Sequence, residues 1–167
     1  MTSQTLVILC EISVIAYALV SGVFLTFSDF VMKSLGATQP AGGIEAMQII
    51  NRKVFRTVFM VLLIGMAILS PVWMGYAFHF LSGTPQVLIL VGGSLYTVGV
   101  LFASLIGNIP MNERLDKLDH TAKETAEYWD FYVRRWSQWN TARTISSALS
   151  AICFLQAAIT LAKMSVS

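Results

Sequence analysis

The side chains best suited to chemistry lie in segment 128–143, YWDFYVRRWSQWNTAR. Aromatic residues and one arginine recur there at spacings of three and four, so on a helix they follow one stripe: Trp129, Tyr132, Trp136, Trp139 and Arg143. Aromatic faces stack on flat molecules and a guanidinium holds ligand oxygens, so the stripe fits a pocket for a flat aromatic ligand. The alternative is interface anchoring, because Trp and Tyr gather at membrane boundaries in any membrane protein.

Amide and carboxylate side chains in two further segments accompany this stripe. Unsatisfied buried amides are costly, so these side chains need partners near a membrane boundary. We expect them to meet at one end of a helical bundle and to surround the ligand. The alternative is structural: the amides tie loops together, and Glu45 forms ion pairs with arginines at helix ends. The set comprises Glu45, Gln48, Asn51, Asn108, Asn112 and Asn140.

Four apolar runs must position these residues. A bilayer core of about 30 Å needs about 20 helical residues. Polar segments 28–56 and 108–143 separate the runs, and the sequence therefore predicts an all-α, single-domain bundle of four membrane-spanning helices. The second and fourth helices are predicted to extend beyond the membrane. The expected spans are residues 5–27, 57–78, 86–107 and 144–162.

Local signals predict where the helices begin and end. Glycine and proline predict a loop over 36–43, followed by one long helix over 43–78. Residues 108–112 are predicted to break the third helix, with Asn112 as the N-cap of a short helix. Residues 121–124 have the capping-box pattern, so the last helix should begin there.

Lysine and arginine predict the orientation in the membrane. Ten of the eleven basic residues fall in segments 28–56 and 108–143, and only Lys163 falls at the opposite side. The positive-inside rule places those segments in the cytoplasm and both termini outside. We therefore expect a multi-pass protein of the plasma (inner) membrane.

Composition narrows the partners. The chain is 56% hydrophobic and 12% charged, and its charges cluster beside the spans, which favours the lipid bilayer and a hydrophobic aromatic small molecule over nucleic acid. Gly99, Ala103 and Gly107 allow close helix approach, either within the bundle or in a homo-oligomer. His79 and His120 are predicted on opposite sides, so we expect neither a metal site nor a cofactor.

Three segments resemble the DUF1772, or anthrone oxygenase, family of small membrane proteins. The matching blocks are GIEAMQIINRKVFR at 43–56, GNIPMNERLDKLD at 107–119 and YWDFYVRRWSQWNTAR at 128–143. The resemblance implies a four-span bundle and an oxidoreductase of the monooxygenase type, since some fungal members oxidise anthrones to anthraquinones with molecular oxygen. Where family members commonly carry a histidine in the last block, this chain has Thr141.

The resemblance implies a cofactor-independent reaction. An anthrone has an acidic C–H between two rings, and removal of this proton gives an enolate that reacts directly with oxygen. The protein then needs a base, stabilisation of negative charge and a water-poor site. Glu45 is the candidate base, and Asn108, Asn140 and Arg143 are candidates for holding the phenolate and the oxyanion. The remaining candidates would bind the substrate: Gln48, Asn51, Asn112, Trp129, Tyr132, Trp136 and Trp139.

The alternative function is a non-catalytic membrane module that binds a lipid, a quinone or a partner protein, or that self-associates. A transporter is less favoured, because the expected spans carry no charges at the membrane midplane.

Overall fold

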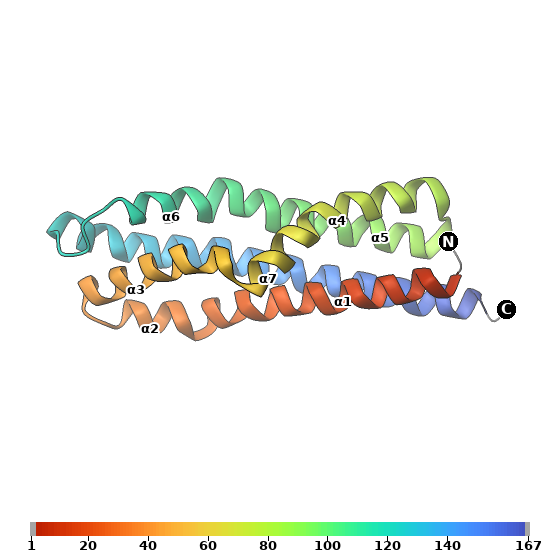
Figure 1. Ribbon diagram of the computed structural model, residues 1–167, viewed down its shortest axis with the longest axis horizontal. Helices are drawn as coiled ribbons and strands as arrows, with labels where there is room; N and C mark the ends of the chain where they lie inside the picture. Colours follow the sequence, from red (N-terminus) through yellow and green to blue (C-terminus); the bar gives the residue numbers. More distant parts are fainter. Residues whose placement is uncertain (1–2, 166–167) are drawn as a thin grey trace.

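Four long helical rods, each long and apolar enough to cross a membrane, form the protein. They cover Ser3–Gly36, Val58–Phe80, Gly83–Asp116 and Lys123–Met164 in a computed structural model that describes residues 3–165. Within these residues there is no strand, and the four-span, all-α prediction is confirmed. Figure 1 shows both termini at one end of the bundle and the α2–α3 and α6–α7 connections at the other, which we call the loop end.

The first rod continues beyond its apolar run. It consists of α1 (Ser3–Thr26), one π-helical segment, η1 (Phe27–Val31), and α2 (Met32–Gly36). The loop predicted over 36–43 is shorter than expected, because α3 (Pro40–Lys53) already begins at the proline. Proline suits the first helical turn, where its missing N–H has no acceptor to serve.

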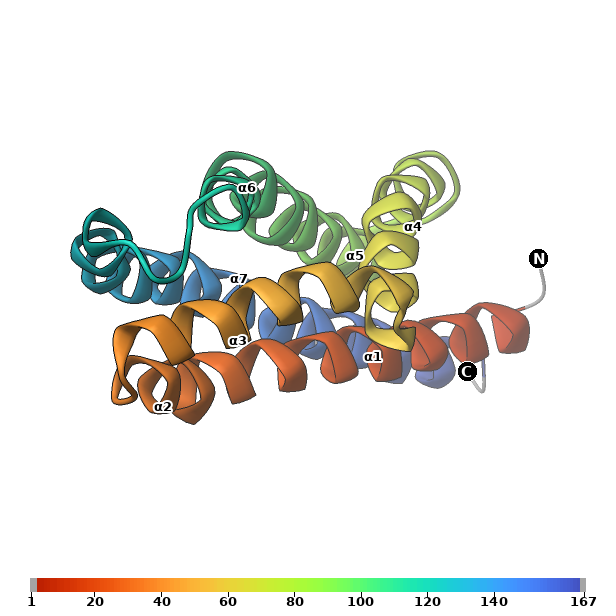
Figure 2. The ribbon, with the colours of Figure 1, turned by 60° about the vertical axis from the view of Figure 1, so that its left-hand side comes forward.

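The single helix predicted over 43–78 was wrong. A 3₁₀ turn, η2 (Val54–Arg56), follows α3, and the extended Thr57 then separates it from α4 (Val58–Phe80). Thr57 acts as an N-cap, since its Oγ1 accepts a hydrogen bond from the Met60 N–H at 3.3 Å. Figure 2 shows α3 and α4 running in clearly different directions.

The predicted break at 108–112 was also wrong. The third rod runs without interruption through α5 (Gly83–Tyr96), the π-helical segments η3 (Thr97–Phe102) and η4 (Ser104–Asn108), and α6 (Ile109–Asp116). Asn112 lies inside α6 and caps nothing; its Oδ1 accepts hydrogen bonds from α7. π-Helical turns of this kind are frequent at functional sites.

The last rod, α7 (Lys123–Met164), runs the length of the bundle and packs against α1 and α5. It begins where the sequence predicted, but the capping box does not form. The backbone N–H and the hydroxyl of Thr121 instead donate to Asp119 Oδ1, at 2.8 and 2.7 Å. These two hydrogen bonds lower the pKa of the Asp119 carboxyl below its ordinary value.

The aromatic stripe of α7 forms part of the interior. Trp129, Tyr132 and Trp136 are buried in a core shared with α2, α3 and α6. Their rings stack in series, with centroids 5.4 Å apart for Trp129 and Tyr132 and 6.5 Å apart for Tyr132 and Trp136. Because these three rings are covered by protein, they hold helices together and do not face a membrane interface.

The glycines of the third rod serve close packing against α7. A Cβ atom added to Gly107 would lie 2.5 Å from Cδ2 of Trp139, and one added to Gly99 would collide with Ser146. Gly99 and Gly107 therefore allow close packing within the bundle, which is one of the two uses expected for them.

We expect Gly107→Ala to destabilise the protein by about 1–3 kcal/mol, because the new methyl group overlaps the Trp139 ring. Gly65→Ala is the matched control, since a Cβ at that helical glycine has nothing within 4 Å. Thermal unfolding in detergent micelles measures both variants. Equal unfolding temperatures for the two would show that Gly107 is not under this constraint.

Candidate functional site

A cavity of about 560 Å³ lies in the half of the bundle toward the loop end. It is bounded by α1 and η1, by α3 and α4, by the third rod, and by α7. Ligand pockets commonly measure about 300–1,000 Å³, so the space is large enough for a fused aromatic ring system.

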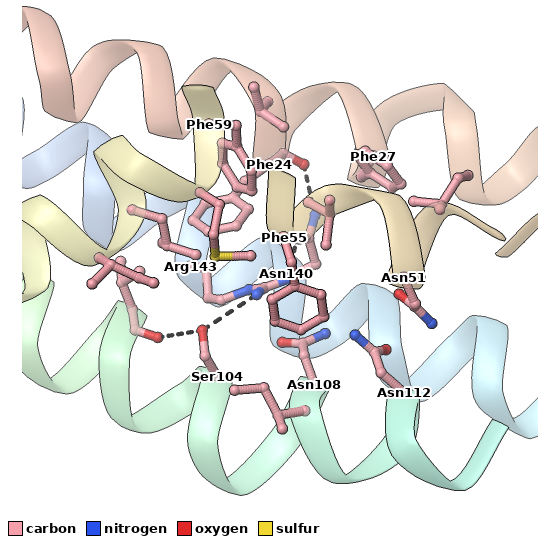
Figure 3. A pocket seen from close by; sticks show the side chains of 18 of the residues that line it. Phe24, Phe27, Asn51, Phe55, Phe59, Ser104, Asn108, Asn112, Asn140 and Arg143 are labelled. Atoms are coloured by element: carbon pink, nitrogen blue, oxygen red, sulfur yellow. Dashed lines mark hydrogen bonds between the residues drawn. The ribbon is translucent and has the colours of Figure 1, made fainter. Parts of the chain in front are cut away.

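The cavity walls are mostly aromatic and aliphatic, and a few polar groups converge on the space. Figure 3 shows Ser104 and Arg143 toward one end of the view and Asn51 and Asn112 toward the other. This is the usual composition of a small-molecule site, in which apolar walls surround a few placed polar groups. The aromatic residues that line the cavity are Phe24, Phe27, Phe55, Phe59 and Trp136.

The cavity brings together six of the eleven residues predicted for the site, from segments far apart in the sequence. These are Asn51, Asn108, Asn112, Trp136, Asn140 and Arg143. The other five do not line it: Glu45, Gln48, Trp129, Tyr132 and Trp139.

Glu45 and Gln48 illustrate the difference within α3. Glu45 is exposed and does not face the cavity, contrary to the expectation for a base. Gln48 is buried, and its amide donates to the carbonyl oxygens of Leu115 and Leu118 at 2.8 and 2.9 Å. Gln48 therefore ties α3 to the end of α6, which is the structural alternative expected for the amides.

Arg143 is the central polar residue of the cavity. Its side chain is 7% exposed, and its Nη2 and Nη1 donate to Asn140 Oδ1 at 2.7 Å and to Ser104 Oγ at 3.3 Å. The guanidinium carbon lies 4.3 Å from the ring centroid of Phe24 and 5.5 Å from that of Trp136. Within residues 3–165, Arg143 has no carboxylate partner, so the expected ion pair with Glu45 does not form.

A buried cation without a carboxylate dominates the local electrostatics. Desolvation of an ion costs several kcal/mol, and neutral partners and ring faces offset only part of this cost. The site is therefore most favourable when a negative charge enters it or develops within it. The Arg143 Nε–H is buried and has no protein partner, so one donor of the guanidinium is unsatisfied.

Asn140 positions Arg143. Its amide is fully buried and donates to the Phe24 carbonyl at 2.6 Å and to Ser28 Oγ at 2.7 Å. Phe24 lies just before η1, where the α-helical hydrogen-bond pattern changes and a side chain can insert. Asn140 thus connects α1 to α7 and orients its own Oδ1 toward the guanidinium.

Two further amides contribute unpaired atoms. Asn108 donates to the Trp136 carbonyl at 3.1 Å, while its buried Oδ1 has no partner. The buried Nδ2 of Asn51, on the opposite helix, also has no partner in hydrogen-bond geometry, although the Tyr132 hydroxyl lies nearby. Asn112 is engaged, since its Oδ1 accepts from the Tyr132 hydroxyl and the Trp136 indole, both at 2.7 Å. Three residues that line the cavity therefore carry an unsatisfied polar atom, one acceptor and two donors, and all three atoms are buried.

Sequence reasoning missed the remaining wall. Phe24, Phe59 and Ser104 carry no local signal, because each lies in an apolar run like any other membrane-facing residue. Glu113 and Asp116 also line the cavity. Both lie in the polar segment 107–119, so the sequence pattern could have identified them as candidates. Among residues 3–165, no group of three or more His, Cys, Asp or Glu side chains could hold a metal ion.

Thr141 lies outside the cavity. It is exposed, and its hydroxyl donates to the Ser137 carbonyl at 2.8 Å and lies 3.1 Å from Ser28 Oγ. This position, at which the resemblance raised the expectation of a histidine, therefore contributes nothing to the walls of this site.

Most of the residues that line the cavity lie in a region of the chain that matches a known protein family. The family model described as anthrone oxygenase matches residues 52–153, which is more than half of the chain. The chain belongs to the anthrone oxygenase family. The matched region includes Asn108, Asn112, Trp136, Asn140 and Arg143, so most of the cavity lining lies within the family match, while the walls from α1, η1 and most of α3 precede it. No curated protein and no solved structure matches the chain.

We expect Asn140→Ala to destabilise the protein by about 2–3 kcal/mol, because the Phe24 carbonyl and the Arg143 guanidinium both lose a buried partner. Thr141→Ala is the matched control on the same helix, and being exposed it should change stability by less than about 0.5 kcal/mol. Thermal unfolding in micelles compares them. An Asn140→Ala variant as stable as Thr141→Ala would contradict the positioning role.

Proposed function

We propose that this protein is a membrane-embedded oxygenase that binds a flat, phenolic aromatic substrate of the anthrone or quinol type in the cavity and oxidises it with molecular oxygen. The observation that carries the proposal is Arg143, a buried guanidinium without a carboxylate, in an aromatic-walled cavity of about 560 Å³. Such a site stabilises an enolate more than the neutral substrate, which is the requirement for catalysis of proton loss.

The proposed reaction is balanced without any added reductant. A base takes one proton from the methylene carbon of the anthrone, and the enolate gives electrons to O₂ to form a carbon–oxygen bond; the resulting peroxide anion takes up one proton and becomes a hydroperoxide. Loss of the second proton from that carbon then forms the ketone of the anthraquinone and breaks the O–O bond, and the departing hydroxide takes up a proton to give one water molecule. Both oxygen atoms of O₂ are accounted for, one in the quinone and one in water.

The roles of the polar residues follow from their unpaired atoms. In this proposal the buried charge of Arg143 stabilises the developing oxyanion, and Asn140 and Ser104 keep the guanidinium in place. Asn108 Oδ1 and Asn51 Nδ2 are buried and unsatisfied, and in this proposal small side-chain rotations bring them to oxygen groups of the substrate. The apolar walls exclude water, which strengthens each of these interactions.

Glu113 is the proton acceptor in this proposal, in place of Glu45. Two carboxylates line the cavity, Glu113 and Asp116, and Asp116 is engaged by Arg52 at 2.7 Å. Glu113 has no ion-pair partner within residues 3–165 and is exposed, so a proton that it accepts can pass to water.

The proposed setting is the plasma (inner) membrane, with the loop end in the cytoplasm and both termini outside. The distribution of charge supports this orientation, since ten of the eleven basic residues belong to the segments at the loop end. The end of the cavity that Glu113 and Asp116 line then faces the cytoplasm.

We expect Arg143→Met to lower kcat/KM for 1,8-dihydroxyanthrone by about 10²–10³-fold, because the donor to the oxyanion is lost. Arg143→Lys should recover part of this loss, since it keeps the charge but not the geometry of the guanidinium. Oxygen uptake and quinone absorbance measure the rate above spontaneous oxidation. Arg56→Gln, at an exposed arginine outside the cavity, is the control. Binding of the substrate without any turnover by the wild-type protein would favour the non-catalytic module instead.

Glu113→Gln and Glu45→Gln separate the two candidate bases. We expect Glu113→Gln to lower kcat by about 10²-fold or more, as loss of a general base commonly does. Glu45→Gln should keep the wild-type rate, because Glu45 does not line the cavity. The opposite pattern, with turnover lost only in Glu45→Gln, would return the role of base to Glu45.

A further inference from the structure

We propose that the substrate reaches Arg143 sideways from the bilayer, through an apolar opening between α4 and the η4–α6 stretch of the third rod. This inference rests on the proposed function only in assuming that the cavity binds a flat aromatic molecule. It assigns the substrate class as neutral molecules dissolved in the membrane, and it excludes analogues with a permanent charge.

The two walls of the opening diverge toward the loop end. Where α4 packs on α5 they are tightly joined, since a Cβ added to Gly93 would lie 2.6 Å from Met74 Cγ. Further along, no Cα atom of α4 lies within 8 Å of one in η4 or α6, among the residues that the structure describes. The break at Thr57 directs α4 away from α3, so no backbone fills the wedge between α4 and the η4–α6 stretch.

The rim of the wedge faces outward as well as inward. Ile64 on α4 is 51% exposed and Leu105 on η4 is 49% exposed, and both line the cavity. Ile68 and Ile109 share these two properties. In helices that span a membrane, exposed apolar side chains contact lipid, so the rim connects the cavity with the hydrocarbon region.

The loop end is held together by polar links, in contrast to the rim. Arg52 and Asp116 form an ion pair at 2.7 Å, and Gln48 donates to the Leu115 and Leu118 carbonyls, so α3 is joined to α6 across the loop end. No hydrogen bond or ion pair among residues 3–165 joins α4 to η4 or α6. On the lipid side, therefore, the two walls can separate for a passing ligand by breaking apolar contacts alone.

The chemistry of the cavity agrees with this route. A neutral phenolic molecule partitions into the bilayer, crosses the apolar rim, and loses its proton only beside Arg143, where the anion is stabilised. A sulfonated analogue carries its charge in every state, so it neither enters the hydrocarbon region nor passes the rim.

The test measures binding kinetics of 1,8-dihydroxyanthraquinone, which cannot be oxidised further at the reacting carbon, to the full chain in phosphatidylcholine vesicles. The variants Ile64→Trp and Leu105→Trp narrow the rim. Val61→Trp and Ile106→Trp are matched controls, because Val61 is 71% and Ile106 67% exposed on the same two rods and neither lines the cavity. Stopped-flow absorbance of this dye, 1,8-dihydroxyanthraquinone, follows its association. The same absorbance follows its dissociation when a competing ligand displaces it.

We expect each rim variant to slow association and dissociation at least tenfold by the same factor, leaving Kd within about twofold, while the controls bind at the wild-type rates. Equal slowing of both rates identifies an entry route, because a change in the bound state would alter Kd. Anthraquinone-2-sulfonate should show no binding at matched aqueous concentration.

Three results would overturn the lateral route: unchanged rates in both rim variants, an altered Kd with unchanged dissociation, or rapid binding of the sulfonate. Absence of dye binding to the wild-type protein would overturn it as well. The proposed oxygenase function has a separate readout. If 1,8-dihydroxyanthrone is not turned over while the rim variants slow dye binding, the oxygenase proposal fails and the lateral route stands.

Discussion

The burial of Arg143 is the constraint on which the rest of this site depends. A guanidinium in the interior of a membrane bundle needs partners for its donors, and here they come from Asn140, Ser104 and two aromatic faces. Those partners belong to different helices, so α1, the third rod and α7 must keep their mutual register for the charge to be tolerated. The missing carboxylate means that this network supports the cation without neutralising it, which is what a site for a transient anion requires.

Departures from regular helix geometry create the space around that charge. The π-helical segments η1 and η4 border the cavity, and the break at Thr57 gives α4 a different direction from α3. Without this break, α4 would continue in the direction of α3. These irregularities are compatible with a membrane because side chains satisfy the freed backbone groups, as Asn140 does for the Phe24 carbonyl.

The aromatic stripe of α7 divides into two uses. Trp129 and Tyr132 stack in the core and hold α7 against α2, α3 and α6, whereas Trp136 reaches the cavity and also packs on the guanidinium. Trp139 faces Gly107 on the third rod. A stripe with one helical period can therefore pack in the core over most of its length and line a cavity at a single turn, and its spacing alone does not distinguish the two.

Hydropathy and periodicity are local properties, and they determined the number of spans, their approximate limits and the gathering of the basic residues at one end. They also identified Asn108, Asn140 and Arg143 as unusual polar residues, because amides and a cation beside apolar runs need partners. Only the tertiary structure decided which polar residues share a cavity. Glu45 and Gln48 lie one turn apart on α3, yet one is exposed and the other ties down α6. The walls contributed by Phe24, Phe59 and Ser104 and the break at Thr57 depend on how distant helices pack, and no local pattern carries that information.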